Sequence, residues 1–213
     1  RIASVFNQHR ESFVIDLHSA NQYNVRDGFI NSAFLYMEHF PYVSRLWFGE
    51  YFEYDLEPDY WMTEVSGIPF GLTGEMLEKG GRPYHGLVFG MTTRVYHKYN
   101  PGNIWKIFEE FNIDSSRMIG YWVENSPVKI NNNKIKCTIF QHNDKILISL
   151  ASWSNKTENV YLNFDWEKIN FNNSSASLSS PFIDGLQDYN TYKIGEKIEI
   201  EGNSGIVLIL SKN

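Results

Sequence analysis

The second half of the chain contains short apolar segments in which hydrophobic and polar residues often alternate. Turn-forming residues such as Asn143-Asp144 and Gly202-Asn203 separate these segments. The segments are residues 134–140, 145–153, 159–166, 197–201 and 205–211. Alternation with a period of two is typical of strands, and His142 to Lys145 indicates a hairpin between two of them. Several short strands at this spacing predict a small antiparallel β-sandwich.

The first half has a different pattern, in which short apolar runs alternate with helical ones. Strands are predicted at residues 12–18, 45–50 and 86–91. Helical segments are predicted at 32–40, at 59–77 with breaks at Gly67 and Pro69, and at 103–111 with Asn103 as the N-cap. Strands that alternate with helices imply parallel pairing. The first half is therefore expected to be α/β.

Composition places the division between the two halves near Gly120. Residues 1–120 contain 23 of the 34 aromatic residues and five of the six histidines. The predicted organisation is α/β plus all-β: residues 1–120 form a partial (β/α)-barrel segment of about three βα units, and residues 121–213 form the antiparallel β-sandwich. Side chains capable of chemistry are concentrated in the first part.

Three βα units are too few to close an eight-fold barrel, which needs roughly 250 residues. The first part is thus either an open α/β layer or the last part of a barrel. The opening RIASVFNQHRE looks helical and runs directly into a strand, which favours a chain cut within its fold. An open parallel layer would leave edges uncovered, so we expect a second chain or a missing N-terminal segment to complete the barrel.

Charge and motif content exclude several classes of function. The net charge of -6 argues against nucleic acid or an anionic membrane surface as a partner. No apolar run is long enough to span a bilayer, so membrane insertion is not expected. Cys137 is the single cysteine and reads as a buried strand thiol, and the histidines lack metal-ligand spacing. Neither a metal nor a cofactor is predicted.

Two predicted strands end in carboxylates, at the edge where parallel α/β folds bind ligands. The first of these strands ends with Asp16-Leu17-His18, and Glu50 ends the second. Paired carboxylates beside aromatic rings are the groups that glycoside hydrolysis uses, one as acid and one as nucleophile or base. Asp16 and Glu50 are therefore the candidate catalytic residues. The alternatives are a structural hydrogen-bond acceptor at Asp16 and a turn-capping acid at Glu50.

Candidate substrate-binding residues surround these two carboxylates in the sequence. The segment 51–61, YFEYDLEPDYW, could present aromatic faces to a sugar, or it could be a hydrophobic plug with its acids facing water. For His18, the alternative to a binding role is a packed or solvated side chain. For Arg94, the alternative is an ion pair. The candidates are His18, Asn21, Trp47, Tyr51, Tyr54, Asp55, Trp61 and Arg94.

Six segments carry a resemblance to a known class of protein. FVIDLHSAN, FPYVSRLWFGEYF, SGIPFGLTGEML and GLVFGMTTR resemble the final portion of a glycoside-hydrolase-like (β/α)8 barrel from gut-type glycan-degrading bacteria. MIGYWVENSPV and KILISLASW resemble the β-sandwich that follows such barrels. The resemblance implies an oligosaccharide or glycan substrate and a periplasmic or extracellular location.

The resemblance allows three catalytic layouts if the strands are the sixth, seventh and eighth of a barrel. In barrels resembling retaining β-glycosidases, Glu50 would be the nucleophile. In barrels resembling α-galactosidases, Asp16 would be the acid/base. In barrels resembling substrate-assisted hexosaminidases, this chain would hold only binding residues. We therefore expect the C-terminal portion of a glycoside hydrolase, with a non-catalytic carbohydrate-binding or structural module as the alternative.

Overall fold

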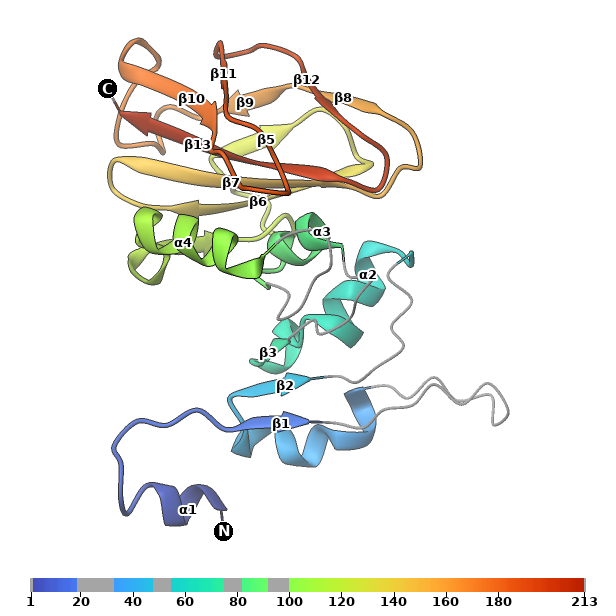
Figure 1. Cartoon of the computed structure of the whole chain (residues 1–213), viewed down its shortest axis with the longest axis vertical. Helices are drawn as coiled ribbons and strands as arrows, with labels where there is room; N and C mark the ends of the chain where they lie inside the picture. Colours follow the sequence, from blue (N-terminus) through green and yellow to red (C-terminus); the bar gives the residue numbers. More distant parts are fainter. Residues whose placement is uncertain (1, 19–32, 48–54, 75–81, 92–99, 213) are drawn as a thin grey trace. The chain divides into compact units, whose positions relative to one another are not determined.

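The computed structural model describes residues 2–18, 33–47, 55–74, 82–91 and 100–212 (Figure 1). The chain divides into two compact units, Arg1–Gly81 and Arg82–Asn213. The second unit starts well before Gly120, where composition placed the boundary. Two helices of the second unit, Pro83–Val88 and Pro101–Phe111, lie in the range that the sequence analysis assigned to the first part.

The first unit contains a small parallel sheet with the order β1-β2-β3. Its strands are β1 (Asp16–His18), β2 (Arg45–Trp47) and β3 (Thr73–Gly74). The pairing β1–β2 is parallel, as is the pairing β2–β3. The remaining elements are α1 (Ile2–Phe6), η1 (Ala33–Tyr42), α2 (Pro58–Tyr60), η2 (Trp61–Val65) and η3 (Ile68–Phe70). The three strands do not close on themselves within the described ranges, so they form an open parallel layer.

The stretch between α2 and β3 is helical and broken, as its glycines and proline predict. Gly67 and Gly71 flank η3 and have φ angles of 68° and 72°, in the left-handed region that favours glycine. Gly74 lies in β3, and the Gly74 amide donates to the Ser66 carbonyl over 2.7 Å. A Cβ atom on Gly74 would collide with the Val65 carbonyl oxygen. The glycines of SGIPFGLTG therefore allow backbone conformations and close backbone contacts here that a residue with a side chain would disfavour.

The second unit is a β-sandwich with two helices. Its large sheet has six strands in the order β11-β10-β13-β7-β6-β4, and two small sheets pair β12 with β8 and β5 with β9. The strand bounds are β4 (Arg117–Ile119), β5 (Val128–Ile130), β6 (Ile135–Gln141), β7 (Lys145–Ser152), β8 (Glu158–Val160), β9 (Leu162–Phe164), β10 (Ala176–Ser180), β11 (Asn190–Tyr192), β12 (Ile198–Ile200) and β13 (Gly205–Lys212). Short 3-10 turns lie at η4 (Ile113–Ser115) and η5 (Asn173–Ser175). All pairings in this unit are antiparallel within the described residues.

Four of the five strands expected in this half of the chain are confirmed, and so is the hairpin. The segment expected as one strand at 159–166 instead supplies parts of two strands, β8 and β9, which pair in different sheets. The His142 amide donates to the Lys145 carbonyl over 2.9 Å, at the end of the β6–β7 ladder. Cys137 is 7% exposed, which confirms the buried strand thiol. Sequence reasoning missed β10, whose residues ASLSS lack an apolar pattern. That strand is held between β11 and β13 by tertiary pairing.

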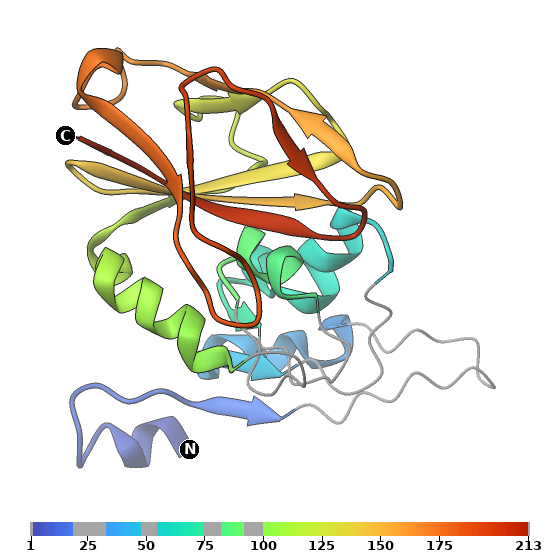
Figure 2. The same ribbon diagram turned by 45° about the horizontal axis from the view of Figure 1, so that its top comes forward.

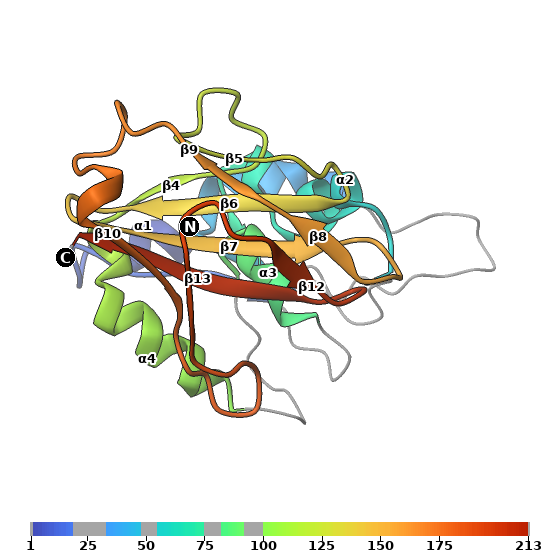
Figure 3. The same cartoon turned by 90° about the horizontal axis from the view of Figure 1, so that it is seen from above.

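One face of the large sheet builds the main core. Alternate residues of β6, β7 and β13 point to the small sheets, where burial of apolar side chains stabilises the sandwich. Figure 3 shows β8, β9 and β12 crossing this face. The core cluster comprises Ile119, Val128, Ile135, Cys137, Ile139, Ile146, Ile148, Leu150, Val160, Leu162, Ile169, Phe171, Leu178, Ile198, Ile200, Leu208 and Leu210.

The opposite face of the large sheet is covered by helices α3 (Pro83–Val88) and α4 (Pro101–Phe111) (Figure 2). Helix α3 contacts β7, β13 and β6. The Lys145 ammonium donates to the Glu110 carbonyl over 3.2 Å and lies 4.8 Å from the Phe111 ring centroid. Because both faces are covered, β7 is buried along nearly its whole length. That explains why KILISLAS reads as a nearly continuous apolar run.

Two local predictions in this region are wrong. Residues 86–91, expected as a third strand, contribute instead to α3 and the turn that follows it. Every residue of α3 after Pro83 is buried, so the segment lacks the polar positions that would reveal helical periodicity. The N-cap of α4 is Asn100 rather than Asn103, because the Asn100 side chain accepts from the Gly102 amide over 2.9 Å and Pro101 occupies the first helical turn.

Candidate functional site

The carboxyl ends of β1 and β2 lie side by side. In the parallel register His18 is aligned with Trp47, and Leu17 with Leu46. The Ser44 and Arg45 amides both donate to the Ile15 carbonyl, over 2.9 and 3.1 Å, where the pairing begins. The structure therefore brings the backbones of two predicted binding residues, His18 and Trp47, to one edge of the sheet. Residue Glu50 follows this edge in the sequence.

Asp16 lies at the opposite end of β1, because the paired part of the strand begins with it. Its register partner is Arg45, and the Asp16 Oδ2 atom is 3.7 Å from the Arg45 Nη2 atom. The two side chains are 27% and 44% exposed, so the ion pair is shared between protein and water. The Asp16 carboxylate therefore has an ion-pair partner on the neighbouring strand. This geometry favours the structural alternative that the sequence analysis left open for Asp16.

Two of the candidate binding residues in the aromatic segment 51–61, Asp55 and Trp61, fall within the described part of the chain. Trp61 begins η2 and is 0% exposed. A fully buried ring offers no face to a ligand, so the prediction of Trp61 as a sugar platform is corrected to a core side chain. Asp55 is exposed and remains accessible to a ligand. For Trp61, the alternative of a hydrophobic plug is the better description.

The remaining candidates lie outside the described residues. These are Asn21, Glu50, Tyr51, Tyr54 and Arg94. The side chains of His18 and Trp47 are likewise not described, although their backbones are. In the ranges that the structure describes, no three His, Cys, Asp or Glu side chains are grouped as a metal site. The same ranges contain no helix long and apolar enough to cross a membrane.

A buried histidine lies between α3 and the large sheet of the second unit, and the sequence analysis gave it no role. His85 is 0% exposed, and its ring centroid is 4.1 Å from that of Trp153 in an edge-on arrangement. The pKa of His85 is lowered to about 3, mainly by burial and in addition by the charge of Arg82, while hydrogen bonding with the Ser152 backbone opposes the shift. His85 is therefore neutral at physiological pH and packs as an aromatic side chain.

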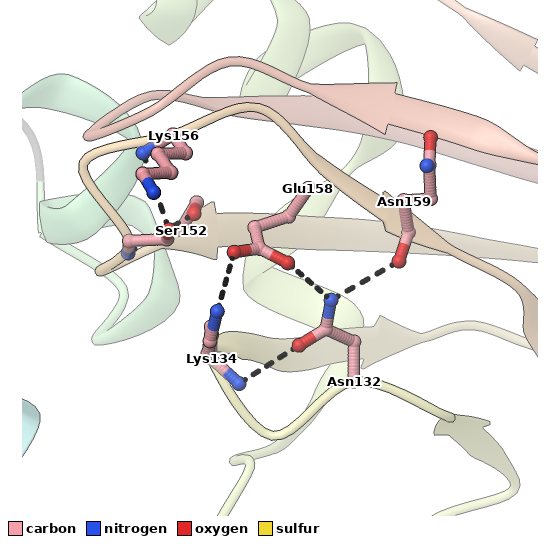
Figure 4. Close-up of polar contacts among 7 residues, drawn as sticks. Asn132, Lys134, Ser152, Lys156, Glu158 and Asn159 are labelled. Atoms are coloured by element: carbon pink, nitrogen blue, oxygen red, sulfur yellow. Dashed lines mark hydrogen bonds and ion pairs between the residues drawn. The ribbon is translucent and has the colours of Figure 1, made fainter.

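A charged network joins the turn before β6 to the start of β8 (Figure 4). Glu158 Oε1 accepts from the Lys134 ammonium over 2.9 Å, and Glu158 Oε2 accepts from the Asn132 amide over 3.0 Å. These bonds, with one from Ser154, hold the pKa of Glu158 at about 2. A carboxylate held ionised in this way cannot serve as a proton donor near neutral pH. The network is thus a structural clamp between two sheets.

Comparison with protein families identifies both parts of the chain. Residues 1–96 match the sequence model described as Glycoside hydrolase 123, TIM-barrel domain. Residues 100–211 match the one described as Glycoside hydrolase 123, C-terminal domain. The chain belongs to glycoside hydrolase family 123. This confirms the resemblance to a glycoside-hydrolase-like barrel protein with an appended C-terminal domain.

Other comparisons are less informative for this member of family 123. No curated protein matches its sequence. A solved structure that is similar in part is a β-porphyranase of glycoside hydrolase family 86 from the human gut bacterium Bacteroides plebeius. The two share 15% sequence identity with a TM-score of 0.33, over 94% of this chain and 41% of the other. The chain thus spans about two fifths of the length of that enzyme.

The junction between the two family 123 domains falls between residues 96 and 100. The compact units divide earlier, after Gly81. Helix α3 accounts for the difference. It lies in the sequence that matches the TIM-barrel domain, and it packs on the large sheet of the second unit. The Tyr84 hydroxyl donates to the Leu186 carbonyl over 2.9 Å, and Arg82 Nη1 donates to Asn203 Oδ1 over 2.8 Å.

Proposed function

We propose that the first unit supplies the last parallel strands of a (β/α)8 barrel in a glycoside hydrolase, with its glycan substrate at their carboxyl ends. The observation that supports this most directly is the parallel register of β1, β2 and β3. Ligands of parallel α/β folds bind at that end of the strands. Membership of family 123 makes a glycosidic bond the expected target.

In this proposal Glu50 is the leading catalytic carboxylate. It comes three residues after Trp47, the last residue of β2, and so follows the edge at which substrate is expected. One carboxyl group of the site protonates the leaving oxygen, and a second acts as nucleophile or as base for a water molecule. Glu50 would take one of these roles. Asp16 is the weaker candidate for the other, because it begins its strand and pairs with Arg45.

Most of the proposed substrate-binding residues follow the same edge in the sequence. His18 and Trp47 are register neighbours there. Asn21, Tyr51, Tyr54 and Asp55 come soon after the strand ends in the sequence, and Arg94 follows α3. Hydroxyl groups of a sugar both donate and accept hydrogen bonds, so amide, carboxylate and guanidinium groups all suit them.

The test compares Glu50→Gln and Asp16→Asn in the full-length protein with a matched control, Glu57→Gln. Glu57 is an exposed acid that precedes α2. Turnover of aryl glycosides would be measured together with the thermal midpoint of each variant. Removing an acid/base or nucleophilic carboxylate should lower kcat by about a thousandfold. We expect that loss for Glu50→Gln at an unchanged thermal midpoint, and no loss for the control.

The outcome for Asp16→Asn separates two roles. A loss of kcat comparable to that of Glu50→Gln would make Asp16 the second carboxylate. A lower thermal midpoint with nearly unchanged kcat would assign Asp16 to the ion pair with Arg45. Unchanged turnover in both variants would remove these residues from catalysis. Glycan binding by a protein that never hydrolyses would instead support the non-catalytic carbohydrate-binding alternative.

A further inference from the structure

A pocket of about 440 Å³ opens on the β-sandwich, and one continuous stretch of chain forms it. Its walls come from the connection between β4 and β5, from β5 itself, and from the turn and first residues of β6. The volume lies within the range of pockets that hold small organic ligands. None of the residues discussed so far as candidate catalytic or substrate-binding groups lines it.

The floor of the pocket is apolar. Val128 and Ile135 are each 2% exposed, and Cys137 is 7% exposed. Burial raises the pKa of the Cys137 thiol to about 12, so the sulfur is a neutral, unreactive part of this floor. These residues belong to the core cluster of the sandwich. These three side chains close the pocket from below but are themselves buried. The apolar lining that a ligand could reach comes from Val123, which is 39% exposed, and from Ile130, which is partly buried.

The rim of the pocket carries three exposed polar side chains. Glu124, Lys129 and Asn133 line the pocket and are exposed. Across the part of the chain that the structure describes, their side chains make no hydrogen bond or ion pair. A carboxylate only accepts, an ammonium only donates, and an amide does both. The rim therefore offers all three kinds of hydrogen-bonding group around one opening.

The framework that carries these groups is fixed by its own hydrogen bonds. The Tyr161 amide donates to Asn131 Oδ1 over 2.9 Å, and the Lys134 amide donates to Asn132 Oδ1 over 3.0 Å. On the other side, the Tyr121 amide donates to Thr138 Oγ1 over 3.2 Å. Because the backbone is already held in place, binding would not require ordering of these turns, which lowers the entropic cost of association.

An aromatic ring completes the wall of the pocket. Tyr121 packs edge-on against Trp122 and Phe89, at centroid distances of 5.1 and 5.8 Å. The Lys136 ammonium lies 5.4 Å from the Tyr121 centroid and donates to the Asn133 carbonyl over 3.3 Å. The ring is thus fixed in orientation, and its lysine neighbour adds a further donor at the rim.

We propose that this pocket binds one or two residues of a neutral saccharide. A sugar hydroxyl donates and accepts at once, which matches a rim of carboxylate, ammonium and amide groups, and the C–H face of a sugar ring matches the apolar lining. The rim carries charges of both signs, from Glu124 on one hand and from Lys129 and Lys136 on the other, and a neutral sugar can hydrogen-bond to all three. The choice of a saccharide as the ligand rests on the proposed function. The description of the pocket itself, its shape and its lining, is independent of that proposal.

The test is a titration of the full 213-residue chain with lactose, cellobiose and glucuronic acid, followed by amide NMR. We expect a neutral disaccharide to shift resonances of residues 121–137. The double variant Glu124→Gln/Asn133→Ala should bind at least about tenfold more weakly, since it loses two rim partners. The double variant Glu167→Gln/Asn143→Ala, at two exposed positions that do not line the pocket, should bind like the original chain.

Three results would overturn the proposal. The first is that none of the three compounds shifts the amide resonances of residues 121–137. The second is that the rim variant and the original chain bind the disaccharide equally well. The third is that glucuronic acid binds more tightly than either disaccharide. The NMR spectrum of each variant also reports whether it is folded. Repeating the titration with Glu50→Gln separates this proposal from the proposed function. Binding at residues 121–137 should persist in that variant whether or not Glu50 proves to be catalytic.

Discussion

Acidification should destabilise the second unit through His85, beginning at a pH above the range in which carboxylates titrate. In the folded chain, burial lowers the pKa of His85 to about 3, with the Arg82 charge adding to the shift. In the unfolded chain a histidine has a pKa of about 6.5. The unfolded state therefore takes up the proton first as the pH falls. Stability that is fully present above about pH 6.5 is lost progressively down to about pH 3.

The size of the effect follows from these two values. Each pKa unit corresponds to about 1.4 kcal/mol of differential free energy between the protonation states. Between about pH 6.5 and about pH 5 the folded histidine stays neutral while the unfolded one is protonated. The free energy of unfolding should therefore fall by about 2 kcal/mol from pH 7 to pH 5 on account of this residue.

His85→Phe is the variant that isolates this contribution. It keeps an aromatic ring against Trp153 and removes the titrating group. Urea denaturation followed by tryptophan fluorescence, at about pH 7 and about pH 5, measures the free energy of unfolding in each case. His9→Gln, at an exposed histidine of the first unit, is the control and should keep the full pH dependence. If His85→Phe loses as much stability on acidification as the original chain, the reasoning is refuted.

Two further predictions concern the clamp at Glu158 and the glycines of the first unit. Because hydrogen bonds lower the pKa of Glu158 to about 2, its stabilising contribution is present above about pH 4.5 and is lost as the pH falls toward 2. Denaturation curves of Glu158→Gln should lack this acid-dependent loss, and an unchanged loss would show that the clamp contributes nothing. Gly74→Ala should lower the free energy of unfolding by about 2–3 kcal/mol, because its Cβ would collide with the Val65 carbonyl. Gly71→Ala is the matched control, because a Cβ atom there meets open space. Its only cost is the left-handed φ of 72°, which lowers the free energy of unfolding by about 1 kcal/mol. Equal thermal midpoints for the two variants would contradict the contact at Gly74.

The β-sandwich was the most predictable part of the protein. Its long strands β6, β7 and β13 are apolar runs bounded by turn residues, and local pattern suffices to find such runs. The strand β10 could not be found in this way. Its polar residues are paired because β13 and β11 lie on either side, and that arrangement is a property of the sheet rather than of the segment.

The sequence predicted the location of the candidate site better than it predicted the contacts and burial of the individual side chains. Alternating strands and helices predicted the parallel edge that carries His18 and Trp47. The pairing of Asp16 with Arg45 was not predictable, because it depends on a register between segments 29 residues apart. The full burial of Trp61 was not predictable either, since an aromatic residue among acids can face either water or the core.

Residues 73–74 and 83–91 show most clearly which features the amino-acid sequence determines by itself and which depend on the tertiary structure. The amino-acid pattern identifies GLVFGM as a buried apolar segment, and that part of the interpretation is correct. Whether such a segment is a helix or a strand depends on the surface that covers it, here the outer face of β7 and β13. The third parallel strand is instead Thr73–Gly74, two residues with no apolar pattern of their own. Local sequence determines which side chains avoid water, whereas the partners available in three dimensions determine the backbone conformation in which they do so.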